Sequence, residues 1–273
     1  GPDVFLMKNL WLGRERDKIA ALPAASSPIS PSQFRATFVD GAGALIADDG
    51  SLIGVPLTMD SLALFYNKDI FDATGIAKPT ATWEEFVAVS RLLTRVAANG
   101  DIGKSGAALG TASNVPYALE LVSALMMQEG DVIVGRDGNM DLQHGALQAL
   151  QFYASFADRR NQNFSWTDRM SSALDAFAQG DAAMAFGGSS DIQKIMLKNP
   201  HLNFAVAPLP QFAGGATRTF GTYVFPAVSR VGTHPSEAWA FALFTASHDA
   251  AVLYIGASGH PPARRDLIAA SSA

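Results

Sequence analysis

The hydrophobic pattern of the chain is densest between Gly54 and Asp69, in the stretch GVPLTMDSLALFYNKD. Residues 55–57 form a short apolar run, and residues 62–66 form a second run rich in the large side chains that favour buried strands. The pattern predicts two buried strands with Asp60 between them. Because an unpaired carboxylate in a core is strongly unfavourable, we expect Asp60 to lie at an opening and to bind a ligand.

Elsewhere the apolar positions alternate between strand and helix spacing, which is typical of an α/β protein. Strands are predicted at residues 3–7, 107–110, 181–186, 203–207 and 220–228, with a turn at 135–138. Helices are predicted at residues 32–40, 68–73, 118–128, 147–156, 170–178 and 235–246. Thr82 and Glu85 have the spacing of a capping box, which predicts a further helix beginning beside them.

The composition permits a large folded protein and excludes several classes of function. With 273 residues, 48% hydrophobic and 16% charged, the chain can bury a sizeable core as one large domain or two lobes. A net charge of −5 argues against a nucleic-acid partner. No apolar run approaches the roughly 18 to 20 residues needed to cross a bilayer. The absence of cysteine excludes a disulfide scaffold, a thiolate metal site and a cysteine nucleophile.

No catalytic or cofactor-binding motif emerges from the remaining residues. The five histidines show no metal-ligand spacing and lie outside any acid-base motif, so we expect no metal and no cofactor. The turn at residues 187–191, GGSSD, allows close backbone approach, and Ser189 could cap a helix beginning near Asp191. By motif alone this is an ordinary strand-to-helix turn, since it is neither a Walker A loop nor a nucleophile elbow.

The strand at residues 3–7 delivers polar and aromatic side chains to its carboxyl end, where ligands bind in open α/β sheets. These are Lys8, Asn9 and Trp11. From the residues alone, the favoured interpretation is that Trp11 packs under the next helix and that Lys8 is solvated.

Four stretches of the chain, in the same order and at the same spacings, resemble one family. They are residues 54–71 with the following Thr82–Phe86, then 176–184, 203–210 and 235–241. Together they are similar to the sugar-type extracellular solute-binding proteins of bacterial ABC importers, the group that includes maltose-binding protein. The resemblance covers most of the chain.

The resemblance implies an α/β chain with the periplasmic-binding-protein type II fold, in which two α/β lobes joined by a hinge enclose a ligand cleft. It implies lobe 1 at residues 1–58, lobe 2 at 59–220, a return of lobe 1 at 221–259, and the start of a return to lobe 2 at 260–273. Because residues 1–6 resemble the family's third strand, and the family continues past residue 267, we expect an internal fragment. It would lack the first strand-helix units and the C-terminal helices.

The resemblance also implies a function. The chain would be an extracytoplasmic, monomeric binding protein, without cofactor or nucleic-acid partner, that carries a carbohydrate or polyol to a membrane permease; its signal segment is not present in this chain. Carried over by position, the expected ligand-binding residues are Lys8, Asn9, Trp11, Thr222 and Tyr223 in lobe 1, and Asp60, Asn114, Tyr117, Ser189, Ser190 and Asp191 in the hinge and lobe 2. The chain departs from maltose-binding relatives at Ser190, where they have tryptophan, and at Asn114, where they have glutamate.

Two other functions fit the residues less well. A hydrolase or transferase could use Ser189 or Ser190 as nucleophile with Asp191 nearby, although no histidine is placed in the sequence to serve as base. A domain descended from a binding protein could instead serve in protein interactions without binding a solute.

Overall fold

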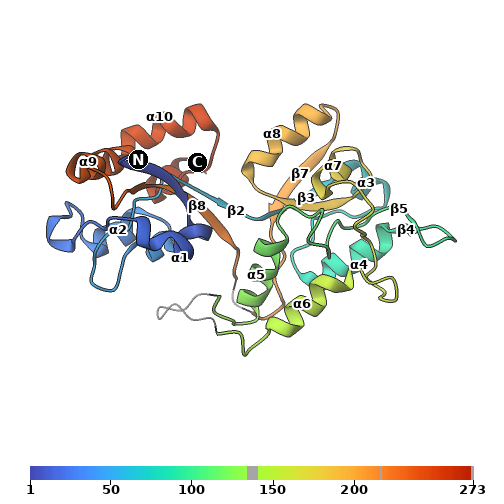
Figure 1. The fold of residues 1–273 in the computed structure, drawn as a ribbon. Helices are drawn as coiled ribbons and strands as arrows, with labels where there is room; N and C mark the ends of the chain where they lie inside the picture. Colours follow the sequence, from blue (N-terminus) through green and yellow to red (C-terminus); the bar gives the residue numbers. More distant parts are fainter. Residues whose placement is uncertain (134–140, 216, 272–273) are drawn as a thin grey trace. The chain divides into compact units, whose positions relative to one another are not determined.

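The computed structural model describes residues 1–133, 141–215 and 217–271, and they form two compact α/β units (Figure 1). Unit 1 combines Gly1–Asp60 with Gly221–Ala273, and unit 2 is the continuous segment Ser61–Phe220. Each unit has its own sheet and its own hydrophobic core. The predicted turn at residues 135–138 lies outside the described residues.

The sheet of unit 1 has three strands in the order β1-β8-β2. Its central strand β8 (Gly221–Val228) runs antiparallel to β1 (Val4–Lys8), so that the end of β1 lies beside the start of β8. The third strand is β2 (Thr58–Ser61). Phe225 of β8 and Trp239 of helix α9 (Pro235–Thr245) are both buried in the core of unit 1. The Trp239 indole donates to the Ala20 carbonyl at 3.0 Å. The core thereby joins the two sequence segments of unit 1.

Short helices make up most of the remainder of unit 1. They are the 3-10 helices η1 (Asn9–Trp11), η2 (Arg16–Lys18), η3 (Ala24–Ser26) and η4 (Asp40–Leu45), and the α-helices α1 (Leu12–Glu15), α2 (Pro31–Thr37), α10 (His248–Ser258) and α11 (Arg265–Ser271). Among the described residues no single helix is long and apolar enough to cross a bilayer; only α9 and α10 taken together reach that length and composition, as a pair bent by 68°.

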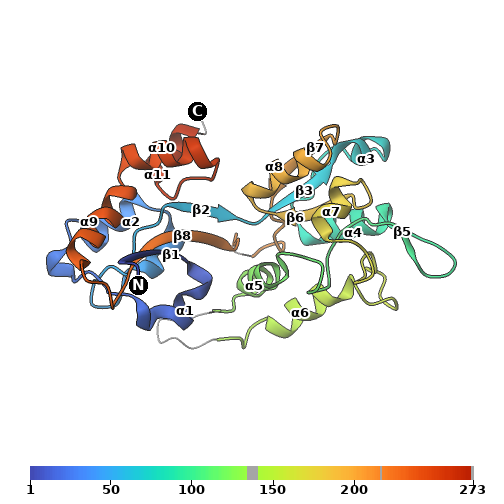
Figure 2. The same ribbon diagram turned by 45° about the horizontal axis from the view of Figure 1, so that its top comes forward.

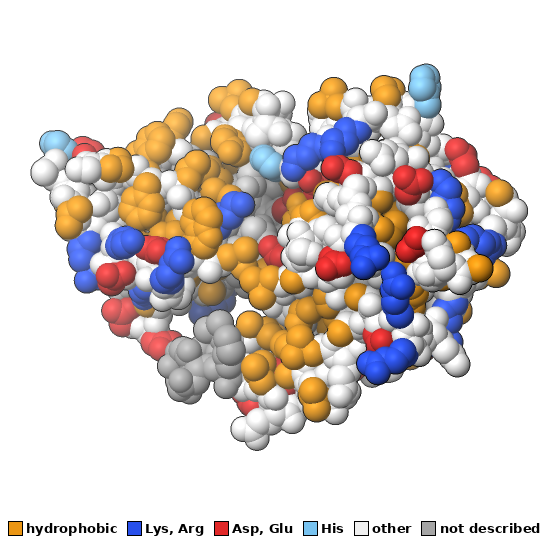
Figure 3. All heavy atoms as spheres, turned by 45° about the vertical axis from the view of Figure 1, so that its right-hand side comes forward, with side chains coloured by type: hydrophobic (Ala, Val, Ile, Leu, Met, Phe, Trp, Pro, Cys, Tyr) orange, Lys and Arg blue, Asp and Glu red, His pale blue; other side chains and the backbone are white. Residues whose placement is uncertain are grey.

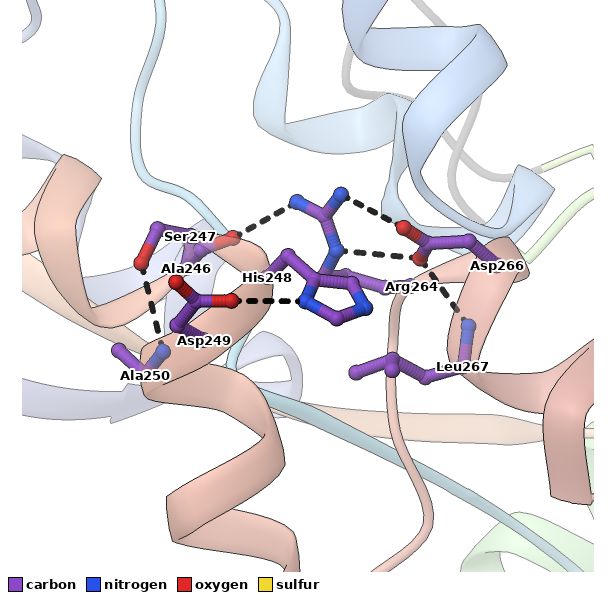
Figure 4. A network of polar contacts seen from close by, with 8 residues as sticks. All are labelled: Ala246, Ser247, His248, Asp249, Ala250, Arg264, Asp266 and Leu267. Atoms are coloured by element: carbon purple, nitrogen blue, oxygen red, sulfur yellow. Dashed lines mark hydrogen bonds and ion pairs between the residues drawn. The ribbon is translucent and has the colours of Figure 1, made fainter.

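Residues 262–266 fasten the end of the chain to unit 1 (Figure 4). The Arg264 guanidinium donates to the Ala246 carbonyl at 3.0 Å, which caps the end of α9, and to both carboxylate oxygens of Asp266, at 3.1 and 2.9 Å. This hydrogen bonding holds the pKa of the Asp266 carboxyl below its usual value. The Arg265 guanidinium donates to the carbonyl of Phe38, the C-cap residue of α2, at 2.8 Å.

The attachment differs from the sequence prediction, which has residues 260–273 beginning a return to the second lobe. The described part of this segment packs on unit 1 instead. The reason is local: the carbonyls at the carboxyl ends of helices α2 and α9 lack helical partners, and the two adjacent arginines supply donors to them.

The sheet of unit 2 has the order β6-β3-β7. Its central strand β3 (Ala63–Asn67) pairs antiparallel with β6 (Met184–Gly187) on one side and with β7 (Phe204–Pro208) on the other. A separate hairpin joins β4 (Arg95–Val96) and β5 (Ile102–Lys104). The antiparallel pairing places Gly187, at the end of β6, opposite Ala63, at the start of β3.

Six helices surround the sheet of unit 2 in its described part. They are α3 (Lys68–Ala73), α4 (Trp83–Leu93), α5 (Ala118–Gln128), α6 (Ala146–Ser155), α7 (Ala173–Ala178) and α8 (Ser189–Lys198). Helices α5 and α6 lie side by side, and α7 packs on α8 (Figure 2). The predicted capping box begins α4: the Glu85 amide donates to Thr82 Oγ1 at 3.2 Å, and the Thr82 amide donates to Glu85 Oε2 at 3.4 Å.

A buried polar pair lies at the centre of unit 2. Trp83, in the first turn of α4, packs its ring 5.3 Å from Phe86 and donates its indole N–H to Gln128 Oε1 at 2.8 Å. Gln128, at the end of α5, donates in turn to the carbonyls of Pro210 and Arg218 at 3.1 and 3.0 Å. One glutamine side chain therefore links two helices to the segment that leads into β8.

Two predicted strands are wrong, although both segments are buried. Residues 55–57 precede β2, which begins at Thr58 and itself contains Asp60. Pro56 has no N–H for a ladder, and a Cβ on Gly54 would lie 2.3 Å from the Phe225 ring, so this segment packs closely against β8 with one backbone bond, from the Leu57 amide to the Val224 carbonyl at 2.9 Å. Residues 107–110 form a single ladder-like bond, in which the Ala108 amide donates to the Met184 carbonyl at 3.0 Å. Apolar runs predict burial here but not strand pairing.

The Arg264 contacts generate a stability prediction. We expect Arg264→Ala to lower the free energy of unfolding of unit 1 by about 1 to 3 kcal/mol, because a donor to a helix-end carbonyl and a partly buried ion pair are lost together. Urea unfolding monitored by circular dichroism measures the change. Arg35→Ala, which removes an exposed guanidinium from α2, is the control and should stay within about 0.5 kcal/mol of the parent protein. Equal effects of the two substitutions would contradict the role of Arg264.

Candidate functional site

The structure brings together five of the candidate residues of unit 1. Lys8 ends β1, Asn9 and Trp11 lie in the 3-10 helix that follows, and Thr222 and Tyr223 begin β8. Lys8 pairs with Val224 across the antiparallel strands, which sets η1 against the start of β8. This group therefore comes from two segments more than 200 residues apart in sequence.

Asn9 holds the group in place. Its Nδ2 donates to the Gly221 carbonyl at 2.9 Å, and its Oδ1 accepts from the Tyr223 amide at 3.1 Å. The side-chain amide thus continues the ladder between β1 and β8 for one step beyond the end of β1. Both ends of the amide are used by the backbone, so Asn9 positions its neighbours rather than offering a free pair of hydrogen-bonding groups.

Trp11 and Tyr223 differ in what they present to solvent. Trp11 keeps 46% of its surface exposed, and Lys8 Nζ lies 5.9 Å from the centre of its ring. It therefore does not pack fully under the following helix. Tyr223 is buried beside Phe225, and burial raises the pKa of its hydroxyl to about 12, so the hydroxyl keeps its proton at neutral pH. The group combines a half-exposed aromatic face with an ammonium.

Asp60 lies where the two units meet in the sequence. It is half-buried on β2 and is the last residue of unit 1 before Ser61 opens unit 2. The chain returns to unit 1 at Gly221, directly before Thr222 and Tyr223. Asp60 is therefore part of one of the two connections between the units.

In unit 2, the structure joins Tyr117 and Asp191. Asp191 is 2% exposed, and its Oδ2 accepts from the Tyr117 hydroxyl at 2.5 Å and from the Gly188 amide at 3.0 Å. Its Oδ1 accepts from Lys194 Nζ at 2.8 Å. Lys194 is not among the residues predicted from sequence, although its position one helical turn after Asp191 is a signal for this pair.

These contacts correct the predicted cap. Helix α8 begins at Ser189 with Gly188 as its N-cap, and the carboxylate of Asp191, rather than the hydroxyl of Ser189, binds the Gly188 amide. Ser189 and Ser190 are the first two residues of the helix and are half-buried. Asp191 therefore fixes the start of α8 and the orientation of Tyr117 at the same time.

Asn114 is held by a different part of unit 2 from Tyr117. Its Nδ2 donates to the carbonyls of Thr167 and Met170, both at 3.0 Å, and its Oδ1 accepts from the Trp166 indole at 2.9 Å and bonds the Thr111 hydroxyl. The side chain fastens the loop that precedes α7. Like Asn9, it serves the protein's own backbone.

Electrostatics do not single out a metal or acid-base site. In the part of the chain that the structure describes, no group of three or more His, Cys, Asp and Glu residues could hold a metal ion. The hydrogen bonds found there for histidine rings reach Asp3, Thr233 and Asp249. On the face drawn in Figure 3, basic and acidic side chains are interspersed, in keeping with the small net charge.

The sequence matches the profile of bacterial extracellular solute-binding proteins over residues 1–272. The chain belongs to this family. A Brucella abortus (strain 2308) protein with a presumed binding role is 27% identical over 210 residues, which are 76% of this chain and 49% of that protein. The sn-glycerol-3-phosphate-binding periplasmic protein UgpB of Rhizobium meliloti (strain 1021) is 27% identical over 179 residues, which are 61% of this chain and 38% of UgpB. The chain thus spans half or less of the length of these relatives.

Solved structures confirm the fold. A cyclo/maltodextrin-binding protein complexed with maltotetraose superposes with a TM-score of 0.75 at 20% identity, covering 98% of this chain and 66% of that protein. The predicted membership of the solute-binding family and the predicted periplasmic-binding-protein type II fold are both confirmed. The family and its structural neighbours are binding proteins rather than enzymes.

Asp191 provides a test of the geometry of unit 2. We expect Asp191→Ala to lower the free energy of unfolding by about 2 to 4 kcal/mol, because the Tyr117 hydroxyl, the Gly188 amide and the Lys194 ammonium all lose their acceptor. Chemical denaturation measures the loss. The matched control is Asp175→Ala, which removes an exposed carboxylate paired with Lys198 and should cost less than about 1 kcal/mol. If Asp191→Ala is no more harmful than the control, the carboxylate does not hold this part of the fold.

Proposed function

We propose that the chain is the solute-binding part of an extracytoplasmic binding protein of an ABC importer, and that its solute is a carbohydrate or a related polyol. The observation that carries the proposal is the family match along almost the whole chain. Relatives named for maltodextrin and for sn-glycerol-3-phosphate support a hydroxyl-rich solute, since both compounds present several hydroxyl groups. The solute would be delivered to a membrane permease, with the binding protein acting as a monomer.

In this proposal unit 1 and unit 2 are the two lobes. The connections at Asp60–Ser61 and Phe220–Gly221 would form the hinge between an open and a closed state. A solute that contacts both lobes would shift this equilibrium toward the closed state, by no more than its difference in affinity for the two states.

The chemistry of a sugar assigns roles to the candidate residues. Sugars offer flat apolar ring faces, which stack on aromatic side chains, and a rim of hydroxyls, which bind planar polar groups. The half-exposed ring of Trp11 is suited to stacking, and Lys8 and Asp60 are suited to hydroxyls. We assign the remaining half-buried candidates to the rim of the site; these are Tyr117, Ser189, Ser190 and Thr222. The buried Tyr223 is assigned to the wall beneath it.

Three of the residues expected to contact the solute are assigned a different role. Asn9, Asn114 and Asp191 have their side-chain polar groups bound to other groups of the same unit. We propose that they position the contact residues, with Asn9 acting on Tyr223 and Asp191 acting on Tyr117. A rigid arrangement before binding reduces the entropy lost when the solute binds.

We further propose that the chain binds its solute without chemical change. We expect no turnover of glycosides or esters above background, because the family and its structural neighbours are binding proteins rather than enzymes. Chromogenic glycoside and ester panels measure the rate. A rate that Ser189→Ala or Ser190→Ala abolishes would favour the hydrolase instead.

The contribution of Asp60 tests the site itself. Mass spectrometry of small molecules that co-purify with the protein identifies the solute, and calorimetry then measures its affinity. We expect Asp60→Ala to weaken binding by about 1.5 to 3 kcal/mol, or about tenfold to more than a hundredfold, because a charged acceptor is lost from a partly desolvated hydrogen bond.

The control for charge is Asp48→Ala, which removes an exposed carboxylate from a turn of unit 1 and should leave the affinity unchanged. Unchanged affinity in Asp60→Ala as well would remove Asp60 from the site. Failure of any sugar or polyol to bind the parent protein would count against the proposed function as a whole.

A further inference from the structure

Unit 2 contains a pocket of about 340 Å³ that none of the candidate residues lines. It lies between the turn after residue 110, the end of helix α6 and the loop before α7. The side chains that matter are Thr111, Arg159, Phe164, Thr167, Asp168 and Arg169. Its volume is at the lower end of the range for small-molecule sites, which suits a group the size of one sugar ring.

The walls of this pocket are fixed by buried contacts. Gly110 has a φ of +110°, and a Cβ on it would lie 2.7 Å from the Ala157 amide nitrogen, so glycine lets the turn approach the end of α6. The Tyr153 hydroxyl donates to the Thr111 carbonyl at 2.7 Å, and burial raises the pKa of this hydroxyl. The opposite wall, which contains Thr167, is bound by Asn114. The pocket is therefore preformed.

The polar groups in the pocket include both donors and acceptors. The Arg159 guanidinium lies 5.9 Å from the centre of the Phe164 ring and 3.8 Å from Asp101, while the carboxylate of Asp168 accepts from the Thr167 hydroxyl at 3.2 Å. Within the described residues the Arg169 guanidinium takes part in no ion pair. The lining thus holds two guanidiniums and one carboxylate, and Asp101, which lies outside the lining, pairs with Arg159.

We propose that this pocket binds a neutral sugar unit. A hydroxyl group donates and accepts, so a sugar can use the guanidiniums and the Asp168 carboxylate together, with the Phe164 ring as an apolar surface. A phosphate ester dianion could bond the two guanidiniums, but it offers no donor to the Asp168 carboxylate, whereas a sugar hydroxyl does. The class of ligand rests on the proposed function, whereas the location rests on the pocket alone.

The NMR signals of two tryptophan indoles allow binding in this pocket to be measured separately from binding at the candidate site of unit 1. The chain has four tryptophans, and the Trp166 indole N–H bonds Asn114, which also bonds Thr111 in the pocket wall. Trp11 reports on the candidate site of unit 1. In ¹H–¹⁵N spectra of the whole protein, titrated with maltose, mannobiose and sorbitol, we expect at least one of these probes to shift the Trp166 signal. Glucose 1-phosphate should shift it less at equal concentration.

Substitution of Arg169 gives the decisive comparison. Arg169→Ala should weaken the titration seen at Trp166 about tenfold, the effect of losing a charged hydrogen bond, and should leave any titration seen at Trp11 unchanged. Arg160→Ala, an exposed arginine in the same loop that does not line the pocket, is the matched control and should change neither. Circular dichroism verifies that both variants are folded.

Three results would overturn the pocket proposal. They are a Trp166 signal that no neutral probe moves, a Trp166 titration identical in Arg169→Ala and the parent protein, and a stronger response to glucose 1-phosphate than to every neutral probe. If Trp11 responds to a sugar in any of these cases, the proposed function survives while the second site is lost. If Trp166 responds and Trp11 does not, the pocket proposal stands without the candidate site of unit 1.

Discussion

The hydrogen bond between the Trp83 indole and Gln128 ties the aromatic core of unit 2 to the path of the chain out of that unit. An unpaired indole N–H or amide in this core would be costly, so each group requires the other. Gln128 accepts the indole bond with its Oε1, so its Nε2 is left to donate to two carbonyls of the segment between β7 and β8. The same side chain that satisfies the aromatic core therefore sets the path by which the chain leaves unit 2, immediately before the start of β8 and Tyr223.

The candidate site follows a similar rule on a smaller scale. Asn9, Asn114 and Asp191 are polar and centrally placed, yet their hydrogen bonds serve a strand end, a loop and a helix start. Groups that are already bound to the protein cannot also form the strongest bonds with a solute. Asn9 and Asp191 fix the positions of Tyr223 and Tyr117, and in the proposed site this order would be present before a solute binds.

The sequence predicts the elements better than the side-chain roles. Helices α3 and α5 have the bounds that their apolar spacing predicts, and the Thr82 capping box starts α4, because these signals are local. The runs at residues 55–57 and 107–110 predict burial, but a strand also needs a neighbour to pair with, which distant residues decide. Likewise, nothing near Asn114 in the sequence shows that a loop more than 50 residues away takes its amide. The contact roles of the candidate residues stay predictions.

The order of strands in unit 1 has a consequence for how the chain folds. Strand β1 pairs with β8, whose residues lie more than 210 positions further along, whereas the sheet of unit 2 forms from one continuous segment. Closing so long a loop is entropically unfavourable unless the intervening chain is already compact. Unit 2 can therefore collapse first and bring the two halves of unit 1 within reach of each other. During synthesis, the β1 segment would wait for its partner strand until the chain had been made as far as Val228.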